Sequence, residues 1–343
     1  MAFTNRVDTL TLDYLVPQVV DTVLRGNVFA TAMLAKTKKF RSSTMDFPIK
    51  YQKGIAGTSF SGFDVLPTSA SDVRVLMVYN PRFYAVNVAL PGTDIAANNT
   101  IQKVMDLATV EMRGRAQDLA DDVGNLFYSD GTGNANKDFL GLGALVDDGN
   151  TVATIGGLAR ATYTTLQSTV TAASANKLTL LQMRTLYNAI ADATVIPTTC
   201  YTTYVVSALY ESLLQPQERI MKDVNIAANF KGYTGFKSME FAGMPVIPDR
   251  KATSGVLFFL NEEFLDFYAL PTAIPQFGGE SVPVASKLFV GNSYNEVGSL
   301  GFSWTGWIKS TNQFAFNSFI TPGGNLITDN PRRHGKLTGI TSV

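Results

Sequence analysis

The side chains that most often carry catalysis are scarce in this chain. Histidine occurs once, at His334, so zinc motifs that need two histidines are excluded. The lone cysteine, Cys200, allows no internal disulfide and favours folding in a reducing cytoplasm. Cys200 falls in a predicted strand, where thiols usually pack, and we expect His334 to be solvated in a polar tail. A nucleophilic Cys–His pair is therefore disfavoured.

The glycine-rich and acidic stretches do not match nucleotide or metal sites. Gly141-Leu142-Gly143 lacks the third glycine of a dinucleotide loop, and neither a phosphate loop nor a Gly-x-Ser-x-Gly turn occurs. The acidic spacing from Asp130 to Asp138 is wrong for an EF-hand, which leaves a weakly held cation as the alternative there. We interpret Asp121-Asp122 as solvated helix residues rather than an acid/base pair. The sequence predicts no catalytic residue, no cofactor and no metal site.

Composition favours a chain that buries surface against other proteins. Of 343 residues, 45% are hydrophobic and only 16% are charged, with 22 Phe and 13 Tyr. Much of the surface must then be uncharged. The formal net charge is zero, which argues against a dedicated nucleic-acid binder. No apolar run is long enough to cross a bilayer and no signal-peptide pattern is present, so we expect no membrane partner.

One long amphipathic helix, predicted over 98–128, organises the rest of the chain. Its apolar stripe consists of Ile101, Met105, Ala108, Met112, Leu119, Val123 and Leu126. Asn98, Asn99 and Thr100 offer N-cap side chains, and Pro91-Gly92 argues against an earlier start. We expect the glycines within 129–133 to cap the C-terminal end. Such a helix would be roughly 45 Å long and must lie across another layer along its whole length.

An N-terminal arm is expected over 1–43. Its helical face is marked by Leu10, Leu12, Leu15, Val19, Val23, Leu24, Phe29, Met33 and Leu34. Pro17 interrupts this face, and the cations of 36–39 close the helix. The arm either docks on its own chain or packs on a neighbouring subunit, and the sequence leaves both open. The candidates for contact with a neighbour are Leu12, Leu15 and Phe29.

A long hairpin is predicted over 44–90, where the apolar period changes to two. Met45, Phe47 and Ile49 alternate with polar residues, and a second extended stretch over 73–90 is broken at Asn80-Pro81. Pro48 marks the first strand as an edge strand. The tip between them has too little local structure to bury apolar residues, so a partner surface is favoured over a flap on its own core. The contact candidates here are Tyr51, Lys53, Phe60, Phe63, Val65 and Leu66.

The remaining chain alternates between helical and extended patterns. We expect a helix over 180–190, a buried strand over 195–206, a helix over 207–214 capped by Ser207, a turn into a strand over 241–248, a strand over 255–260, a helical turn over 261–264, a crossover at Gly278-Gly279 and two strands within 297–320. The tail over 331–336 reads as polar and mildly basic.

This order of elements resembles that of the tailed-bacteriophage major capsid proteins of the Hong-Kong-ninety-seven type. The matching motifs are Asp130-Gly131-Thr132-Gly133 with Gly141-Leu142, and Ala242-Gly243-Met244-Pro245-Val246 leading to Gly255-Val256-Leu257. The resemblance covers the chain from about Leu10 to Ile320. It implies an α+β fold with an arm (1–43), an extended β-hairpin loop (44–90), a peripheral domain with a spine helix (91–194), an axial domain (195–276) and a return to the peripheral domain with a C-terminal tail (277–343).

The resemblance implies a shell built from pentamers and hexamers of this chain around double-stranded DNA. DNA would be a partner by non-specific proximity, and the portal would be a further partner. Some members of the family carry a cleaved N-terminal scaffolding segment, for which we see no room before the arm, so a separate scaffolding protein or none is expected. Some also form Lys–Asn crosslinks, but Lys50 and Lys53 are better explained as edge-strand charges. The rivals are an encapsulin-like compartment and, in a different class, a monomeric β-rich adhesin or binding protein.

Overall fold

The computed structural model describes residues 27–40, 43–54, 57–66, 71–97, 101–192, 194–214, 239–270, 302–304 and 307–343. Several expectations fall outside these residues and stay predictions. They are the arm face from Leu10 to Leu24 with Leu12 and Leu15, the caps at Asn98, Asn99 and Thr100, and the crossover at Gly278-Gly279.

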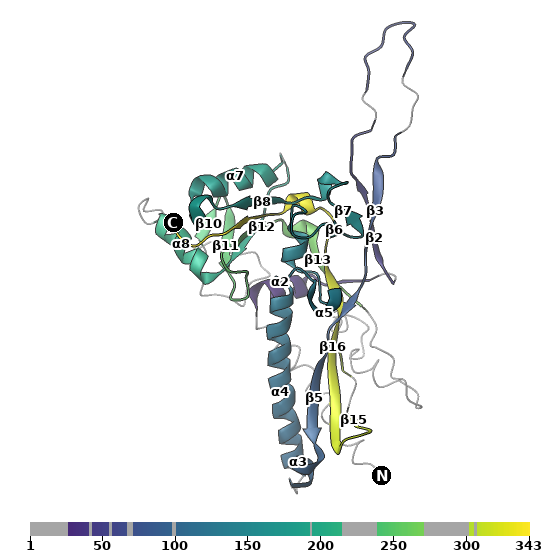
Figure 1. The fold of residues 1–343 in the computed structure, drawn as a ribbon, viewed down its shortest axis with the longest axis vertical. Helices are drawn as coiled ribbons and strands as arrows, with labels where there is room; N and C mark the ends of the chain where they lie inside the picture. Colours follow the sequence, from purple (N-terminus) through teal and green to yellow (C-terminus); the bar gives the residue numbers. More distant parts are fainter. Residues whose placement is uncertain are drawn as a thin grey trace.

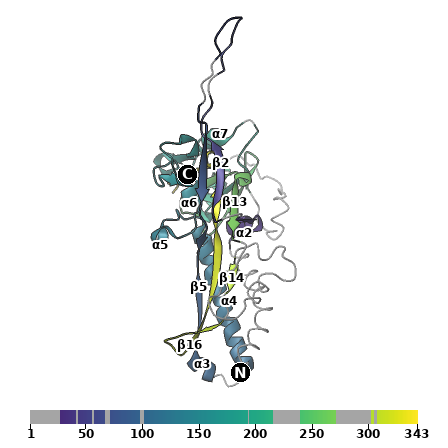
Figure 2. The same ribbon diagram turned by 90° about the vertical axis from the view of Figure 1, so that its right-hand side faces the viewer.

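The molecule is elongated and has a stem, a lobe and a projecting hairpin (Figure 1). In the stem, helix α4 (Ile101–Leu126) runs beside strand β5 (Val86–Pro91), which pairs with the long strand β16 (Ala315–Thr328). The lobe carries helices α7 (Leu180–Ile190) and α8 (Tyr204–Leu214). The hairpin extends away from both parts, as the perpendicular view also shows (Figure 2).

The predicted spine helix is confirmed, but the expected barrier before it is wrong. The stripe residues of α4 that are buried are Ala108, Met112, Leu119, Val123 and Leu126. A short helix, α3 (Gly92–Ala97), begins directly after Pro91. The cause is tertiary: the Gly92 N–H donates to the Phe314 carbonyl (2.7 Å), and a Cβ at Gly92 would lie 2.5 Å from the Phe314 ring. The absent side chain lets the chain turn against β16.

The C-terminal end of α4 is closed by a serine and not by the expected glycines. The helix ends at Leu126, whose carbonyl accepts from the Ser129 N–H (3.1 Å) and hydroxyl (2.8 Å). Gly131 has a left-handed φ of +71°, but it lies beyond this closure. Gly141 has a packing role instead, because a Cβ there would lie 2.4 Å from the Leu126 carbonyl oxygen. The absence of a side chain at Gly141 lets the Gly141-Leu142 segment pack against the C-terminal end of α4.

One sheet, called the stem sheet here, lines α4 and is centred on β16. Its strands are β1 (Lys38–Lys39), β4 (Arg82–Phe83), β5, β13 (Leu265–Ala269), β14 (Phe302–Trp304), β15 (Ile308–Lys309) and β16. Helix α2 (Val28–Ala35) contacts both β13 and α4. Short elements between α4 and the lobe are α5 (Gly133–Asn136), α6 (Leu142–Leu145), η1 (Thr164–Leu166), η2 (Ser174–Asn176) and the small hairpin β6 (Thr154–Ile155) with β7 (Leu158–Ala159).

A second sheet, called the lobe sheet here, has the strand order β10, β11, β9, β12, β17, β8. Its bounds are β10 (Met239–Phe241), β11 (Met244–Pro248), β9 (Thr199–Thr202), β12 (Leu257–Leu260), β17 (Gly335–Thr338) and β8 (Thr169–Ala172). One face, with Cys200 and Phe259, packs under α7 and α8, while Tyr201 and Phe258 on the other face join the core around α2 and α4. Strands β8 and β17 come from outside residues 195–276. The lobe sheet therefore does not coincide with the axial domain expected over 195–276.

Three local expectations in the lobe have clear outcomes. Helix α7 matches the predicted 180–190 and is capped by Thr179, whose hydroxyl accepts from the Gln182 N–H (3.2 Å). Ser207 is not the cap of α8, since the helix begins at Tyr204 and the Thr203 carbonyl accepts from the Ser207 N–H (2.9 Å). The helical turn predicted over 261–264 is present as η5 (Glu262–Phe264).

The polar C-terminal tail is the largest correction. Instead of being solvated, the chain turns through η7 (Pro331–Arg333) and enters the lobe sheet as β17, antiparallel to β12 and parallel to β8. His334 is fully buried and Lys336 is 9% exposed. Pairing on both sides satisfies the backbone groups of this short strand, so it needs no apolar pattern of its own.

Candidate assembly interface

Only part of the hairpin predicted over 44–90 is a hairpin. It consists of β2 (Met45–Lys50) and β3 (Arg74–Tyr79), antiparallel with Met45 opposite Tyr79 and Lys50 opposite Arg74, whereas β4 and β5 pair with β16 in the stem sheet. Along β2, half-buried and exposed residues alternate as expected. The base of the hairpin packs on the stem through the Phe47 ring, which contacts Tyr79 and Tyr268 at centroid distances of 6.2 and 6.0 Å. Beyond the paired strands, the tip stands free of the stem and lobe (Figure 1).

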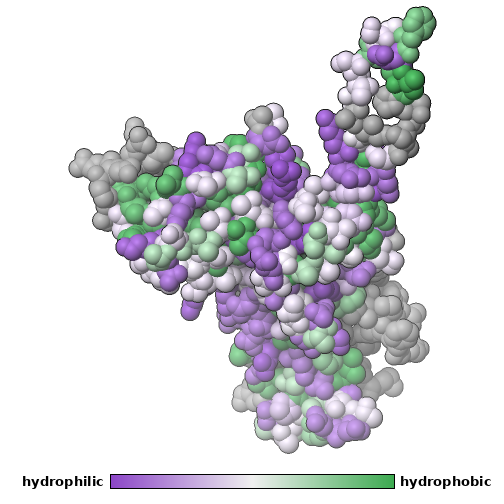
Figure 3. Space-filling view, turned by 45° about the horizontal axis from the view of Figure 1, so that its top comes forward, coloured by the Kyte–Doolittle hydropathy of each residue, from purple (hydrophilic) through white to green (hydrophobic). Residues whose placement is uncertain are grey.

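The tip presents apolar side chains that its own chain does not bury. Phe60 is 65% exposed, Phe63 105%, Val65 94% and Leu66 50%. Figure 3 shows hydrophobic residues gathered at the end of the projecting hairpin. A contiguous exposed apolar group on a soluble protein marks a contact site, so these residues fit their predicted role. Their contact with another copy stays a prediction.

The tip has its shape from local hydrogen bonds rather than from a core. The Asp64 carboxylate accepts from the Ser61 N–H (2.8 Å), and the Asp64 N–H donates to the Ser61 carbonyl (3.1 Å) around Gly62, whose φ is +47°. At the foot of the loop, the Tyr51 hydroxyl donates to the Asp72 carbonyl (3.0 Å) and its ring meets Tyr163 edge-on at 5.0 Å. Tyr51 is thus half-buried and engaged within its own chain, whereas Lys50 and Lys53 are exposed.

Phe29 is not available to a neighbour, which corrects its place among the contact candidates. Its side chain is fully buried, and its ring lies 5.0 Å from Tyr201, 5.3 Å from Tyr128 and 6.1 Å from Phe127. The Phe29 N–H also donates to the Asp249 carboxylate (3.0 Å). The described end of the arm therefore docks on its own chain. Helical spacing identifies the buried face of α2 but carries no information about which body covers it.

Further exposed apolar residues were not anticipated from the sequence. On the lobe they are Leu181, Ile196, Tyr204 and Val205; on the stem they are Val110, Ile308, Phe314 and Phe319. Ile196 and Phe314 lie outside the helices and strands, and the others lie within them. The signal available in the sequence was an apolar residue on the polar side of a predicted helix, as at Leu181 in α7.

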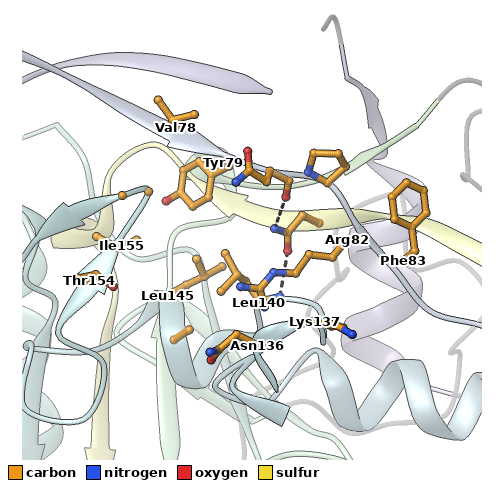
Figure 4. Close-up of a pocket in the computed structure, with 16 residues that line it drawn as sticks. Val78, Tyr79, Arg82, Phe83, Asn136, Lys137, Leu140, Leu145, Thr154 and Ile155 are labelled. Carbon is orange, nitrogen blue, oxygen red and sulfur yellow. Dashed lines mark hydrogen bonds between the residues drawn. The ribbon is translucent and has the colours of Figure 1, made fainter. Parts of the chain in front are cut away.

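A pocket with both polar and apolar walls lies where the hairpin base meets the stem (Figure 4). Its volume is about 500 Å³, and its walls come from β3 and β4, α5, α6, the β6–β7 hairpin and β16. Arg82 crosses it and donates to the carbonyls of Gly131 (2.8 Å) and Asp138. Asn325 bridges the two sides, because its amide donates to the Asn80 carbonyl (2.9 Å) and its carbonyl accepts from the Leu140 N–H (2.9 Å).

A buried charge cluster supports the lobe sheet near this pocket. Asp147 accepts from the Lys336 ammonium (3.1 Å) and lies 3.4 Å from the Arg160 guanidinium. Arg160 is fully buried and also donates to the Ala144 carbonyl (2.7 Å). Burial by itself raises the pKa of Asp147, but N–H groups of Val152 and Gly149 and the Lys336 ammonium outweigh it, so the pKa lies below its ordinary value. The three charged groups pair with one another inside the chain, and we interpret the cluster as structural.

The structure does not bring Cys200 and His334 together as a catalytic pair. Strand β12 separates β9, which carries Cys200, from β17, which follows His334. Burial raises the pKa of the Cys200 thiol far above its ordinary value. Both ring nitrogens of His334 are occupied: Nδ1 accepts from the Asn261 N–H (3.3 Å), and Nε2 lies 3.0 Å from the Thr328 hydroxyl. The described residues hold no cluster of three or more metal-ligating side chains.

Comparison with known proteins identifies the fold. No family model matches the sequence, and no curated protein matches it either. Among solved structures, the cyanophage A-1(L) capsid matches with a TM-score of 0.66 at 14% identity, covering 91% of this chain and 92% of the other. The capsid of a native GTA particle matches with a TM-score of 0.53 at 11% identity, covering 92% and 93%. The Synechococcus elongatus holo-SrpI encapsulin matches with a TM-score of 0.52 at 10% identity, covering 88% and 84%.

This chain therefore has the α+β fold of the Hong-Kong-ninety-seven-type capsid proteins, as the order of its elements indicated. The fold occurs in phage capsids and in an encapsulin. No helix among the described residues combines the length and apolar character needed to cross a membrane.

Proposed function

We propose that this chain is the major capsid protein of a tailed phage, which assembles through pentamers and hexamers into an icosahedral shell around double-stranded DNA. The observation that carries the proposal is the free hairpin tip with its exposed Phe60 and Phe63, set on a capsid fold. A subunit that leaves aromatic side chains outside its own core buries them when copies associate, and contacts repeated around closing rotations give rings and shells.

The charge balance fits such a container. A formal net charge of zero allows DNA to be packed by proximity, whereas a strongly basic lining would hold it by counterion release. In this proposal the partners are other copies of the chain, the portal and a separate scaffolding protein, with no membrane. The protein is assembled in the host cytoplasm and ends in the virion.

An encapsulin-like compartment is the second candidate, because an encapsulin shares the fold over most of its length. The cyanophage capsid match has the higher TM-score, 0.66 against 0.52, and supports the viral proposal. The contents of purified particles separate the two. DNA inside the particles supports the capsid, and a co-purifying enzyme cargo supports the compartment.

The test of the proposal is the size of the expressed protein. Sedimentation and negative-stain microscopy should show pentamers, hexamers or closed shells. A single species at 37.1 kDa would contradict it and favour a monomeric binding protein. On a boiled denaturing gel, the assembled particles should give intact monomer, because Lys50 and Lys53 are interpreted as edge charges and not as crosslinking residues.

A further inference from the structure

The pocket between the hairpin base and the stem has the size and the layout of a small-molecule site. Its volume of about 500 Å³ lies within the range of ligand clefts, about 300–1,000 Å³. Leu145 and Ile155 are buried and form its apolar floor, whereas Asn80, Asn136 and Lys137 are exposed and stand at its rim (Figure 4). An apolar floor with a few polar groups at the rim suits a molecule with one apolar and one polar end.

The charges around the pocket favour an anion. Its described lining contains two cations, Arg82 and Lys137, and none of the described lining residues has a carboxylate side chain. Arg82 is held by two backbone carbonyls. In contrast, the Lys137 ammonium and the Asn136 side-chain amide have no hydrogen bond or ion pair with any described residue. These two neighbours therefore offer donors that the folded chain does not use.

A strained turn presents these two side chains at the rim. In α5, three successive residues other than glycine have left-handed φ values: Asn134 (+49°), Ala135 (+56°) and Asn136 (+64°). This region is unfavourable for residues with a Cβ, and strain of this kind gathers at ligand clamps. The Asn136 N–H donates to the Thr132 carbonyl (3.1 Å) and closes the turn. The backbone thus keeps a costly conformation at the point where Asn136 and Lys137 adjoin the pocket.

We propose that this pocket binds a small organic anion, a carboxylate or a phosphate monoester with an apolar body. Its acidic group is held by Lys137 and Asn136, and its body lies against Leu145 and Ile155. This inference goes beyond the proposed function and does not require assembly. Because the walls come from β3 and β4 on one side and from α5, α6 and the β6–β7 hairpin on the other, a bound molecule connects the hairpin base to the stem.

Calorimetric titration of the full chain with matched probes tests the site. The probes are 2-naphthoate, 1-naphthyl phosphate, the uncharged 2-naphthamide and inorganic phosphate. At least one naphthyl anion should bind with a Kd of about 1 mM or tighter, and the tighter of the two identifies the preferred acidic group. The amide and inorganic phosphate should bind at least about ten-fold more weakly. Equal binding of the amide, or no binding of either naphthyl anion at about 10 mM, overturns the proposal.

Hydrogen exchange locates the bound probe. The tighter naphthyl anion should slow amide exchange on both walls, within residues 77–83 and 154–157. These walls already meet through the Val78 N–H, which donates to the Gly156 carbonyl (2.9 Å). Protection confined to residues 57–66 would show that the probe binds the apolar hairpin tip instead, and this result also overturns the proposal.

Substitutions at the rim test the two donors. Lys137→Gln should weaken binding of the naphthyl anion about three- to ten-fold and leave binding of the amide unchanged. Lys177→Gln is its control, since Lys177 is an exposed lysine outside the described lining. Asn136→Gly removes the amide but tolerates the left-handed backbone, and it should weaken binding about three-fold or more.

The control for Asn136→Gly is Asn134→Gly, which changes the same turn at a position outside the described lining and should leave the affinity unchanged. Full affinity in Lys137→Gln, or an equal loss in the two glycine variants, contradicts the assigned roles. Far-ultraviolet circular dichroism confirms that each variant is folded. Because all measurements use the chain as it purifies, a chain that forms no shell refutes the proposed function and leaves this test intact.

Discussion

Two buried polar side chains, Arg160 and His334, connect segments that are distant in the sequence. The Arg160 guanidinium joins the segment after β7 to the carbonyls of Ala144 and Leu145, and it faces Asp147, which also holds Lys336 of β17. A buried charge that loses its partner costs much more than an exposed one. We therefore expect that replacing a buried arginine lowers the free energy of unfolding much more than replacing an exposed one.

Arg160→Met should lower the free energy of unfolding by about 3–5 kcal/mol, because Asp147 keeps its charge while losing one cation and three carbonyls lose a donor. Urea denaturation at matched protein concentration measures the change. Arg115→Ala is the control, since Arg115 forms an exposed i,i+3 pair with Asp118 (3.1 Å), and its loss should cost less than about 1 kcal/mol. Equal effects at both positions would refute a structural role for the cluster.

His334 should make stability depend on pH below neutrality. Burial lowers the pKa of its imidazole from 6.5 to about 4. The unfolded chain then takes up a proton near pH 6.5 while the folded chain stays neutral. Stability is thus complete above pH 6.5 and falls as the pH drops to about 4, by roughly 3 kcal/mol in total at about 1.4 kcal/mol per pKa unit. Urea denaturation at pH 7 and at pH 4.5 measures this loss.

The His334→Gln variant is the control for this pH dependence, because no other histidine occurs in the chain. It should lose most of the wild-type slope between pH 6.5 and pH 4. Burial raises the pKa of Asp329, which acts in the opposite direction, but that group is present in both proteins and cancels in the comparison. An identical slope in the variant would show that the buried imidazole is not the source.

At the scale of the element, α4 is a single helix with two glycines in different surroundings. A Cβ at Gly114 would meet nothing within 4 Å, whereas a Cβ at Gly124 would lie 2.3 Å from the Asn27 amide nitrogen. That amide donates to the Ala120 carbonyl (2.7 Å) and fixes the start of α2 on the spine. One glycine is therefore a packing requirement and the other is not.

Alanine substitution separates these roles. Gly114→Ala should stabilise the protein by about 0.5–1 kcal/mol, since alanine loses less backbone entropy in a helix. Gly124→Ala should destabilise it by roughly 1–3 kcal/mol, because the methyl group displaces the buried Asn27 side chain. Thermal and urea denaturation of the two variants measure the difference, and a stabilising Gly124→Ala would contradict the close packing of α2 on α4.

At the scale of the whole molecule, the hairpin tip is the part that we propose to be buried by a second copy. Phe60→Asp together with Phe63→Asp should leave the subunit folded, because neither ring contributes to its core, while the assembled fraction falls at least about ten-fold. Sedimentation and negative-stain microscopy provide the measurement. Thr58→Asp with Ser59→Asp is the matched control, which adds the same charge to the tip and keeps both rings. Normal shells from the Phe variant would contradict the proposed role of the hairpin in assembly.

Local periodicity in the sequence determined the elements that bury one face along their own length. The stripe of α4, the alternation along β2 and the helical face of α7 each repeat over enough residues to be recognised without knowledge of the tertiary contacts. The exposed tip was also predictable, since its apolar residues lie between two strands with no local structure to cover them. The order of these elements was sufficient to indicate the capsid fold.

Only the tertiary structure decided where short or ambiguous segments belong. β17 has four residues and no apolar period, and it is a strand because β12 and β8 pair with it on both sides. The Phe29 face is apolar in either environment, and contacts with Tyr128 and Tyr201 place it inside its own chain. The physical reason is the same in both cases. The contacts that stabilise each placement are made by residues far away in the sequence, so the local sequence pattern does not predict them.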